Sequence, residues 1–132
     1  MSTTLRRIGS AVLATVMATS LAAGPALAKG GDGRVIKRGS CSASADWKLK
    51  AKPDDGRLEV DFEVDSNRVG QRWTWTIRHD GRTVSSGTRT TKAPSGSFSV
   101  ERRIVDARGR HTVSATARNK RTGETCRASV RI

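Results

Sequence analysis

Four carboxylates occupy alternate positions in the stretch LEVDFEVD, residues 58–65. Successive side chains of a strand point to opposite faces, so all four share one face. Such a row could bind a metal ion or supply an acid and a base for catalysis. Same-face side chains of a strand stand about 6.5–7 Å apart, too far for a compact calcium site, and a uniform row lacks the two distinct environments that an acid and a base need. The residues are Glu59, Asp61, Glu63 and Asp65.

The preceding segment offers this row an electrostatic partner. Three lysines occupy alternate positions and would lie on one face of a strand: Lys48, Lys50 and Lys52. The turn sequence Pro53-Asp54-Asp55-Gly56 would join the two segments as a hairpin. Directly opposite side chains in a hairpin are about 4.5–5.5 Å apart. We therefore interpret the acidic row as a charge-paired outer face of a sheet rather than as a metal or catalytic site.

The two histidines are the other candidate metal ligands. His79 and His111 lie on the apolar parity of separate segments, with no cysteine or paired carboxylate at zinc-ligand spacing. We predict no metal site and no cofactor. Because no serine sits in a nucleophile elbow, no glycine-rich turn joins a strand to a helix and no Cys/His pair suggests a thiol enzyme, we also predict that the protein is not an enzyme.

Three tryptophans could form a platform on which a sugar ring stacks. Trp47, Trp73 and Trp75 all share the parity of the aliphatic residues in their segments, which favours packing in the core. Trp73 stands nearest the end of its segment, so we expect it to be the one that is partly exposed. It is the tryptophan most suited to meet a ligand.

The chain has only two cysteines, Cys41 and Cys126. In an exported protein a disulfide between them is the default, and they lack the nearby histidine or CxxC spacing of a metal site. We predict a structural disulfide that closes almost the whole domain.

The first residues have the features of a secretory signal peptide. Two arginines precede an apolar run, and the small-residue site Ala26-Leu27-Ala28 ends it. We expect cleavage after Ala28, by the general secretory route in preference to the twin-arginine route, and a secreted, extracellular protein with no membrane span in its mature form. Cleavage removes two of the 25 basic residues and none of the 12 acidic ones, which leaves a net charge of +11.

The mature chain divides into a short lead, residues 29–40, and one domain, residues 41–132. The lead is rich in glycine and has only Val35 and Ile36 as apolar anchors, so it is either a flexible tether or an added strand. The domain contains seven short alternating segments separated by turn signals, of which Asp80-Gly81 is the strongest hairpin signal. Arg102 interrupts the fifth segment, on the parity of its apolar residues, and predicts that this strand ends there or contains a bulge. The segments span about 41–52, 58–65, 71–79, 82–91, 98–104, 110–119 and 124–132.

This pattern predicts an all-β fold, a single antiparallel seven-stranded β-sandwich with one disulfide. The tryptophan-bearing third segment and the Asp-x-x-Gly-x-His-x-Val-x-Ala sequence at 106–115 resemble immunoglobulin-like and fibronectin type III-like domains over residues 41–132. The resemblance implies that His111, where that family commonly has tyrosine, hydrogen-bonds a backbone group of its loop. The sequences DW-LK, D-NR-GQ-W, HDGR, APSGSF and TGE-C also resemble those of small secreted actinobacterial proteins, which implies the same fold and compartment and no activity.

The arrangement of charge leads to two hypotheses of function. If the third, sixth and seventh segments share a sheet, as the resemblance implies, their outward positions carry cations and hydroxyls and no acid. Arginine and hydroxyl groups suit phosphate, carboxylate or sulfate, which favours a non-catalytic adhesion or binding module for anionic polymers of the cell envelope or matrix. A merely solubilising face stays open, and so does an inhibitor or accessory domain that binds another exported protein through the polar strand at 82–91. We expect no physiological nucleic acid. The candidate ligand-binding residues are Arg72, Arg78, Arg118, Arg127 and Arg131.

Overall fold

The computed structural model describes residues 28–29, 33–105 and 109–132. The signal-peptide prediction therefore lies outside the described residues, apart from Ala28 itself. Within the described part of the chain, no helix has the length and apolar character needed to cross a membrane.

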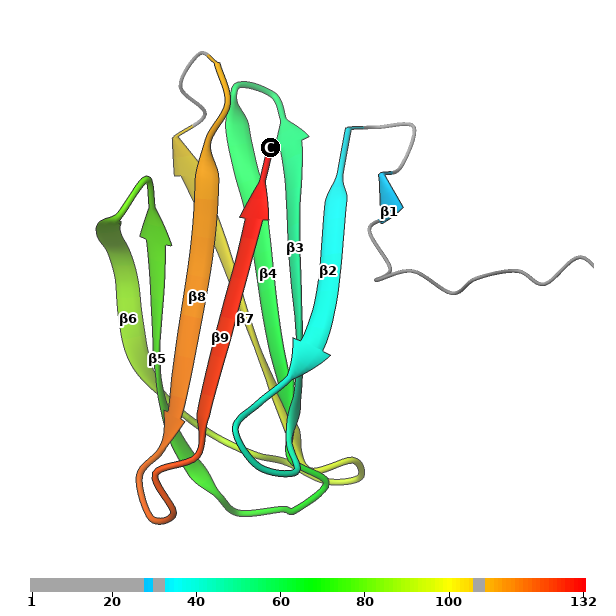
Figure 1. Ribbon diagram of the computed structural model, residues 1–132, viewed down its shortest axis with the longest axis vertical. Helices are drawn as coiled ribbons and strands as arrows, with labels where there is room; N and C mark the ends of the chain where they lie inside the picture. The colour runs from blue at the N-terminus through cyan, green and yellow to red at the C-terminus, as the bar shows by residue number, and fades with distance from the viewer. Residues whose placement is uncertain (1–27, 30–32, 106–108) are drawn as a thin grey trace, which may run out of the picture.

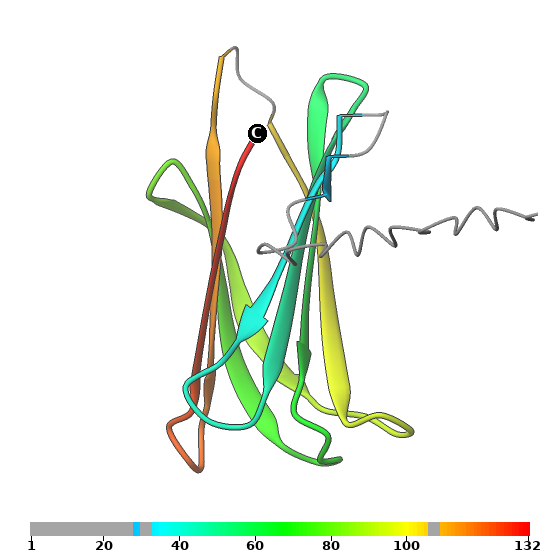
Figure 2. The ribbon, with the colours of Figure 1, turned by 45° about the vertical axis from the view of Figure 1, so that its right-hand side comes forward.

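The regular structure of the described residues is entirely β-strand, arranged as two antiparallel sheets that face each other (Figures 1 and 2). One sheet has the order β1-β2-β3-β4-β7, and the other has the order β6-β5-β8-β9. The strands are β1 (Ala28–Lys29), β2 (Val35–Ser40), β3 (Asp46–Asp54), β4 (Arg57–Asp65), β5 (Arg72–His79), β6 (Arg82–Thr90), β7 (Ser97–Val105), β8 (Thr112–Asn119) and β9 (Thr125–Arg131).

The expectation of an all-β sandwich is confirmed, but the expectation of seven strands is wrong. Eight strands have six or more residues, and the additional one is β2, which lies in the segment considered as a flexible lead. It pairs with β3 along its whole length, from Val35 opposite Ala51 to Ser40 opposite Asp46. The few apolar residues of this segment suffice because an edge strand needs to bury little side-chain surface once its backbone is hydrogen-bonded.

The predicted β3–β4 hairpin is present, with its turn shortened to Asp55-Gly56 because Pro53 and Asp54 pair with Leu58 and Arg57 at the end of β3. Its turn holds Asp55 and Gly56 at positive φ, 52° and 77°. The three lysines face the acidic row across the pair, which confirms that this row is the outer face of a sheet. The facing pairs are Lys48 and Glu63, Lys50 and Asp61, and Lys52 and Glu59.

The core lies between the sheets and contains all three tryptophans. The prediction that Trp73 is partly exposed is wrong, because its side chain is completely buried and its ring lies 6.3 Å from that of Phe98. Trp75 packs over Gly87 of the neighbouring strand β6, where an added Cβ would lie 2.9 Å from the indole. A glycine opposite a tryptophan thus lets the indole cover the adjacent backbone.

Strand β7 neither ends nor bulges at Arg102. Its register with β4 runs unbroken from Ser97 to Val105. Arg102 points inward at the side of the sandwich where β6 and β7 are the outer strands, and its guanidinium lies 5.0 Å from the ring centre of Trp75. Its Nε donates to Ser85 Oγ at 3.0 Å. A cation can therefore stand at an inward-facing position of β7, because it bridges the two sheets.

The predicted disulfide between Cys41 and Cys126 is present. It joins the segment after β2, in one sheet, to β9 in the other. Glu124 fastens the same segment, because its Oε2 accepts hydrogen bonds from the backbone N–H groups of Ala43 and Ala45, at 3.1 and 2.9 Å. The disulfide and this carboxylate therefore attach the N-terminal strand across the end of the sandwich.

Candidate functional site

The outer surface of the four-stranded sheet brings together the five arginines that the sequence singled out. Each strand alternates between buried residues and outward polar ones, so the outward side chains of β5, β8 and β9 form a regular array. We call this surface the arginine face. It contains Arg72, Arg78, Arg118, Arg127 and Arg131, with hydroxyl-bearing threonines and serines between them.

Strand pairing sets the spacing between the side chains of the arginine face. Thr76 lies opposite Thr116, which lies opposite Arg127, and Thr74 lies opposite Arg118 in the adjoining row. Arginines on neighbouring strands are therefore offset diagonally. Adjacent strands are about 4.8 Å apart, so guanidinium groups stand within reach of successive charges on one extended polymer.

Charge is segregated between the two sheets. Strands β5, β6, β8 and β9 contain seven arginines and no Asp or Glu. Strands β2, β3, β4 and β7 contain eight Lys or Arg and seven Asp or Glu. The excess positive charge of the described strands is therefore concentrated on one side of the sandwich, which a scattered surface charge would not produce.

A basic hollow adjoins one end of the arginine face. It has a volume of about 540 Å³ and is lined by Arg72 together with three cations from loops, Arg68, Lys120 and Arg121. Alternation did not single out these three cations, because they lie in turns rather than on a strand. Backbone pairing across the end of the sheet, from Lys120 N to Arg72 O at 3.0 Å, brings them together.

Strand β6 is the other predicted interaction element, and it forms an outer edge of its sheet. Its side chains are exposed at every position except Ser85, which is half-buried. One edge of its backbone is hydrogen-bonded to β5, and no described strand pairs with the other.

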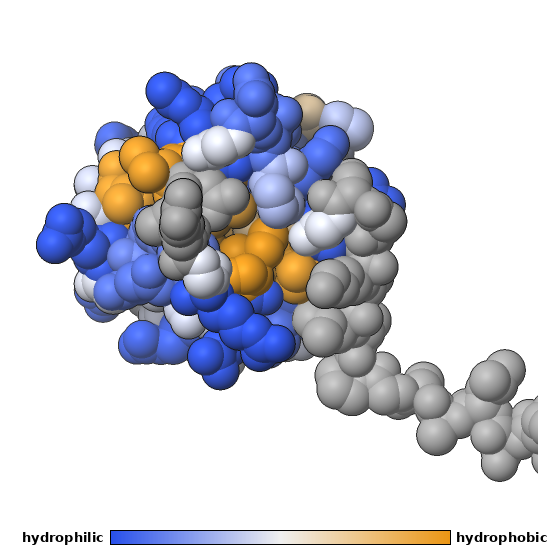
Figure 3. All heavy atoms as spheres, turned by 90° about the horizontal axis from the view of Figure 1, so that it is seen from above, coloured by the Kyte–Doolittle hydropathy of each residue, from blue (hydrophilic) through white to orange (hydrophobic). Residues whose placement is uncertain are grey.

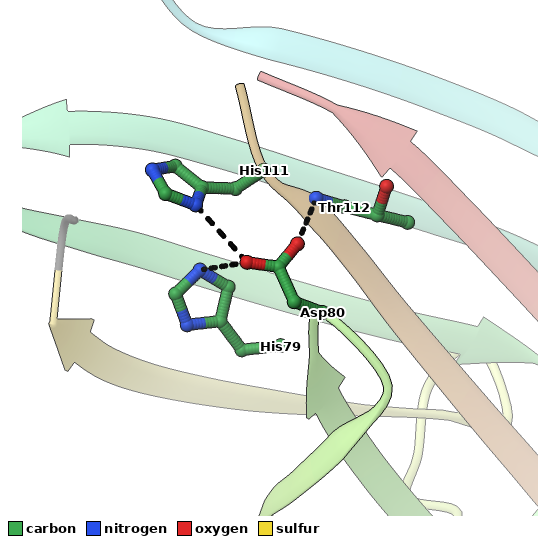
Figure 4. Close-up of polar contacts among 4 residues, drawn as sticks. All are labelled: His79, Asp80, His111 and Thr112. Carbon is green, nitrogen blue, oxygen red and sulfur yellow. Dashed lines mark hydrogen bonds and ion pairs between the residues drawn. The ribbon is translucent and has the colours of Figure 1, made fainter. Parts of the chain in front are cut away.

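The opposite end of the molecule contains a cluster that the sequence analysis did not predict. Both histidines of the chain, His79 and His111, lie beside the carboxylate of Asp80 (Figure 4). We call these three residues the histidine cluster. His111 Nδ1 lies 3.2 Å from Asp80 Oδ2, and His79 Nε2 lies 3.7 Å from the same oxygen. The two imidazole rings are 4.9 Å apart at their centres.

Local structure holds Asp80 in this place. It is the first residue of the Asp80-Gly81 hairpin turn, and both residues have positive φ, 49° and 80°, as a type I′ turn requires. The backbone N–H of Thr112 donates to its Oδ1 at 2.8 Å. This hydrogen bond and the one with His111 hold the pKa of the Asp80 carboxyl below its usual value, with smaller contributions from the charges of the two histidines.

The histidine cluster lies beside a hollow at an end of the sandwich. His79, Asp80, Arg57, Arg82, Arg103 and the apolar residues Val84, Ile104 and Val105 line this hollow. Val105 and Val84 are exposed, at 73% and 41%. Seen from this end, apolar surface appears in the middle of hydrophilic surroundings (Figure 3).

Thirty-two residues separate His79 from His111 in the sequence, so spacing alone could not associate them. They meet because β5 pairs with β8, with His79 opposite Val113. The described partner of the His111 ring is the Asp80 side chain, and residues 106–108 of its own loop lie outside the described residues. The signal that could have found the cluster is the hairpin Asp80 beside a histidine at the end of a predicted inner strand.

No protein-family model matches this chain, and the search of curated proteins found no match. Function is therefore inferred from the geometry of the arginine face, the edge of β6 and the histidine cluster.

Proposed function

We propose that this protein is a secreted, non-catalytic binding module that associates through its arginine face with anionic polymers of the cell envelope or extracellular matrix. The observation that carries the proposal is that the acidic residues of the described strands are confined to one sheet, which leaves the other with an uncompensated positive charge. Seven arginines and no acidic residue occupy the strands of one sheet, whereas positive and negative charges nearly balance in the other.

The chemistry of the arginine face fits a repeating anion. Guanidinium groups form two parallel hydrogen bonds to a carboxylate, phosphate or sulfate, and threonine and serine hydroxyls between them can donate to the remaining oxygens. Four of its five arginines are exposed and Arg78 is half-buried, so the face is an open surface that suits an extended polymer better than a small enclosed ligand. Such binding depends on the release of counterions and weakens as the salt concentration rises.

The proposed fold family and compartment agree with this function. The order β3-β4-β7 in one sheet and β6-β5-β8-β9 in the other is an arrangement expected of an immunoglobulin-like or fibronectin type III-like sandwich, with β2 added at the edge. The leader sequence and the disulfide support an exported protein in an oxidising environment. Exported anionic polymers would then be the accessible ligands.

The test is co-sedimentation of the purified protein with the wall fraction of the producing cell over a series of salt concentrations. The variant Arg78→Gln/Arg127→Gln/Arg131→Gln removes three charges from the arginine face. Its matched control, Lys48→Gln/Lys50→Gln/Lys52→Gln, removes three charges from the outer face of the other sheet. We expect the arginine variant to lose at least ten times more affinity than the lysine variant. Equal losses of affinity would show that binding depends on total charge and not on the arginine face. That result, or no binding at low salt, would overturn the proposal.

A second candidate function rests on the exposed edge of β6. A partner could add a strand to this edge through main-chain hydrogen bonds, which would make the protein an inhibitor or accessory domain for another exported protein. Such a complex would be insensitive to salt. Replacing Ser86 with proline would remove a backbone donor at this edge strand and should abolish that complex while the arginine variant leaves it intact.

A further inference from the structure

We propose that His79, Asp80 and His111 form a binding site for one divalent transition-metal ion, with Zn²⁺ as the best match. The site is independent of the arginine face, which lies on the outer surface of a sheet, whereas the histidine cluster lies at one end of the sandwich (Figure 4). The cluster contains every histidine of the chain, so any imidazole-dependent metal binding by this protein must use it.

Two of the three distances within the histidine cluster are close to those between the ligands of a tetrahedral ion. One ligand atom from each residue lies within 4.8 Å of the other two, and two of the separations are 3.2 and 3.7 Å. Ligand atoms around tetrahedral zinc are about 3.3–3.4 Å apart when the bonds are about 2.0–2.1 Å long. The two imidazole nitrogens, up to 4.8 Å apart, must approach each other by about 1.4 Å to reach the separation of tetrahedral ligands, whereas both already lie near that separation from Asp80 Oδ2.

The carboxylate is already oriented for this role. Thr112 N–H holds Asp80 Oδ1 at 2.8 Å, which leaves Oδ2 directed toward both imidazoles. A hydrogen bond to the non-ligating oxygen is the kind of contact that orients carboxylate ligands in metal sites. The hairpin turn that places Asp80 is fixed by backbone conformation, so little conformational entropy would be lost on binding.

Pairing with a neighbouring segment fixes the backbone at each histidine. His111 exchanges two backbone hydrogen bonds with Ile132, at 2.7 and 2.9 Å, and its side chain is only 4% exposed. His79 is 14% exposed, and its Nε2 is buried without a hydrogen-bond partner among the described residues. A buried ring nitrogen without a partner costs free energy, and coordination of a metal ion would satisfy it.

Ion binding requires both imidazoles to be neutral, with an unprotonated nitrogen facing the ion. Binding through His111 Nδ1 therefore requires that nitrogen to carry no proton, so its hydrogen bond with Asp80 Oδ2 would be replaced by the bonds to the ion. Arg57, Arg82 and Arg103 line the adjoining hollow and oppose any cation, although Arg103 is itself paired with Asp54 at 3.1 Å. This surrounding charge disfavours Ca²⁺ and Mg²⁺, which bind mainly through charge and oxygen ligands, more than Zn²⁺, which bonds strongly to imidazole.

The experiment uses the untagged secreted protein, because a polyhistidine tag would bind the same ions. We expect isothermal titration calorimetry to show one Zn²⁺ per chain. We also expect Co²⁺ to produce the visible absorption of a tetrahedral complex, which ions bound loosely at the surface do not produce. His79→Gln and Asp80→Asn should each lower the Zn²⁺ affinity at least tenfold and abolish the Co²⁺ absorption.

The matched control is Asp55→Asn. Asp55 has the same place in the β3–β4 turn that Asp80 has in the β5–β6 turn, before a glycine and at a φ of 52° against 49°. It should leave metal binding unchanged. Near-ultraviolet circular dichroism would establish that each variant is folded, and the more exposed His79 keeps the test decisive if His111→Gln fails to fold. The proposal is overturned if Zn²⁺ does not bind, if Co²⁺ remains octahedral, or if the control loses as much affinity as Asp80→Asn.

Discussion

Removal of the disulfide should destabilise the protein strongly, because it closes nearly the whole domain. Cys41 and Cys126 are 85 residues apart in the sequence. For a loop of that size the chain-entropy relation assigns about 4.6 kcal/mol to the cross-link, as an upper value because denatured chains retain some structure. Domains of this size are stable by about 5–15 kcal/mol, so the double variant Cys41→Ala/Cys126→Ala should lose a large part of its stability.

Urea unfolding followed by tryptophan fluorescence measures this loss. With a slope near 1.5 kcal/mol/M, a loss of about 3–4.6 kcal/mol moves the midpoint down by about 2–3 M. The slope itself should rise, because the denatured chain without the cross-link exposes more surface. Reduced wild-type protein should unfold within about 1 kcal/mol of the variant, since Cys126 is buried and its replacement by alanine removes few contacts. A loss below about 1 kcal/mol at unchanged slope would refute the entropic reasoning.

Three further substitutions test individual contacts in the same urea assay. Arg102→Ala should lower the free energy of unfolding by about 2 kcal/mol, because it removes the cation–π contact with Trp75 and a charged hydrogen bond. Its control, Arg103→Ala, removes an exposed ion pair and should lower the free energy of unfolding by less than about 1 kcal/mol. Equal losses would contradict the bridging role of Arg102. Glu124→Ala should cost about 1–3 kcal/mol by leaving two backbone N–H groups without their acceptor, and glutamine should restore part of it; no recovery would assign the effect to packing. Gly87→Ala should cost about 1–3 kcal/mol and red-shift the fluorescence, because its Cβ would displace the indole of Trp75; unchanged emission would count against this.

Much of the fold follows from local pattern. The alternation in LEVDFEVD predicts a strand with one apolar face, and the turn sequence Pro53-Asp54-Asp55-Gly56 predicts a hairpin with the preceding lysine-bearing strand, both of which the structure contains. The prediction about Arg102 failed because a long side chain can bury its stem and still bring its guanidinium to a hydroxyl and an aromatic ring. The alternation of residue types along one strand cannot indicate a partner that lies on another strand.

The eighth strand shows a different limit. The segment Val35–Ser40 has little apolar pattern, and its position is decided by backbone pairing with β3 and by the disulfide that follows it. Gly39 packs against the indole of Trp47, where a Cβ would come within 2.5 Å of the ring. These contacts are between residues distant in the sequence or on different strands, and neither periodicity nor composition reports them.

The sequence by itself determined the strand class, the hairpins, the basic character and the only possible disulfide, because these depend on alternation, turn residues and residue counts. Tertiary structure alone decided which faces share a sheet. It placed all the acidic residues of the described strands in one sheet, and it brought Asp80 between two histidines that are 32 residues apart. The physical reason is that side-chain direction follows from local backbone geometry, whereas the neighbours of a side chain depend on which strands pair.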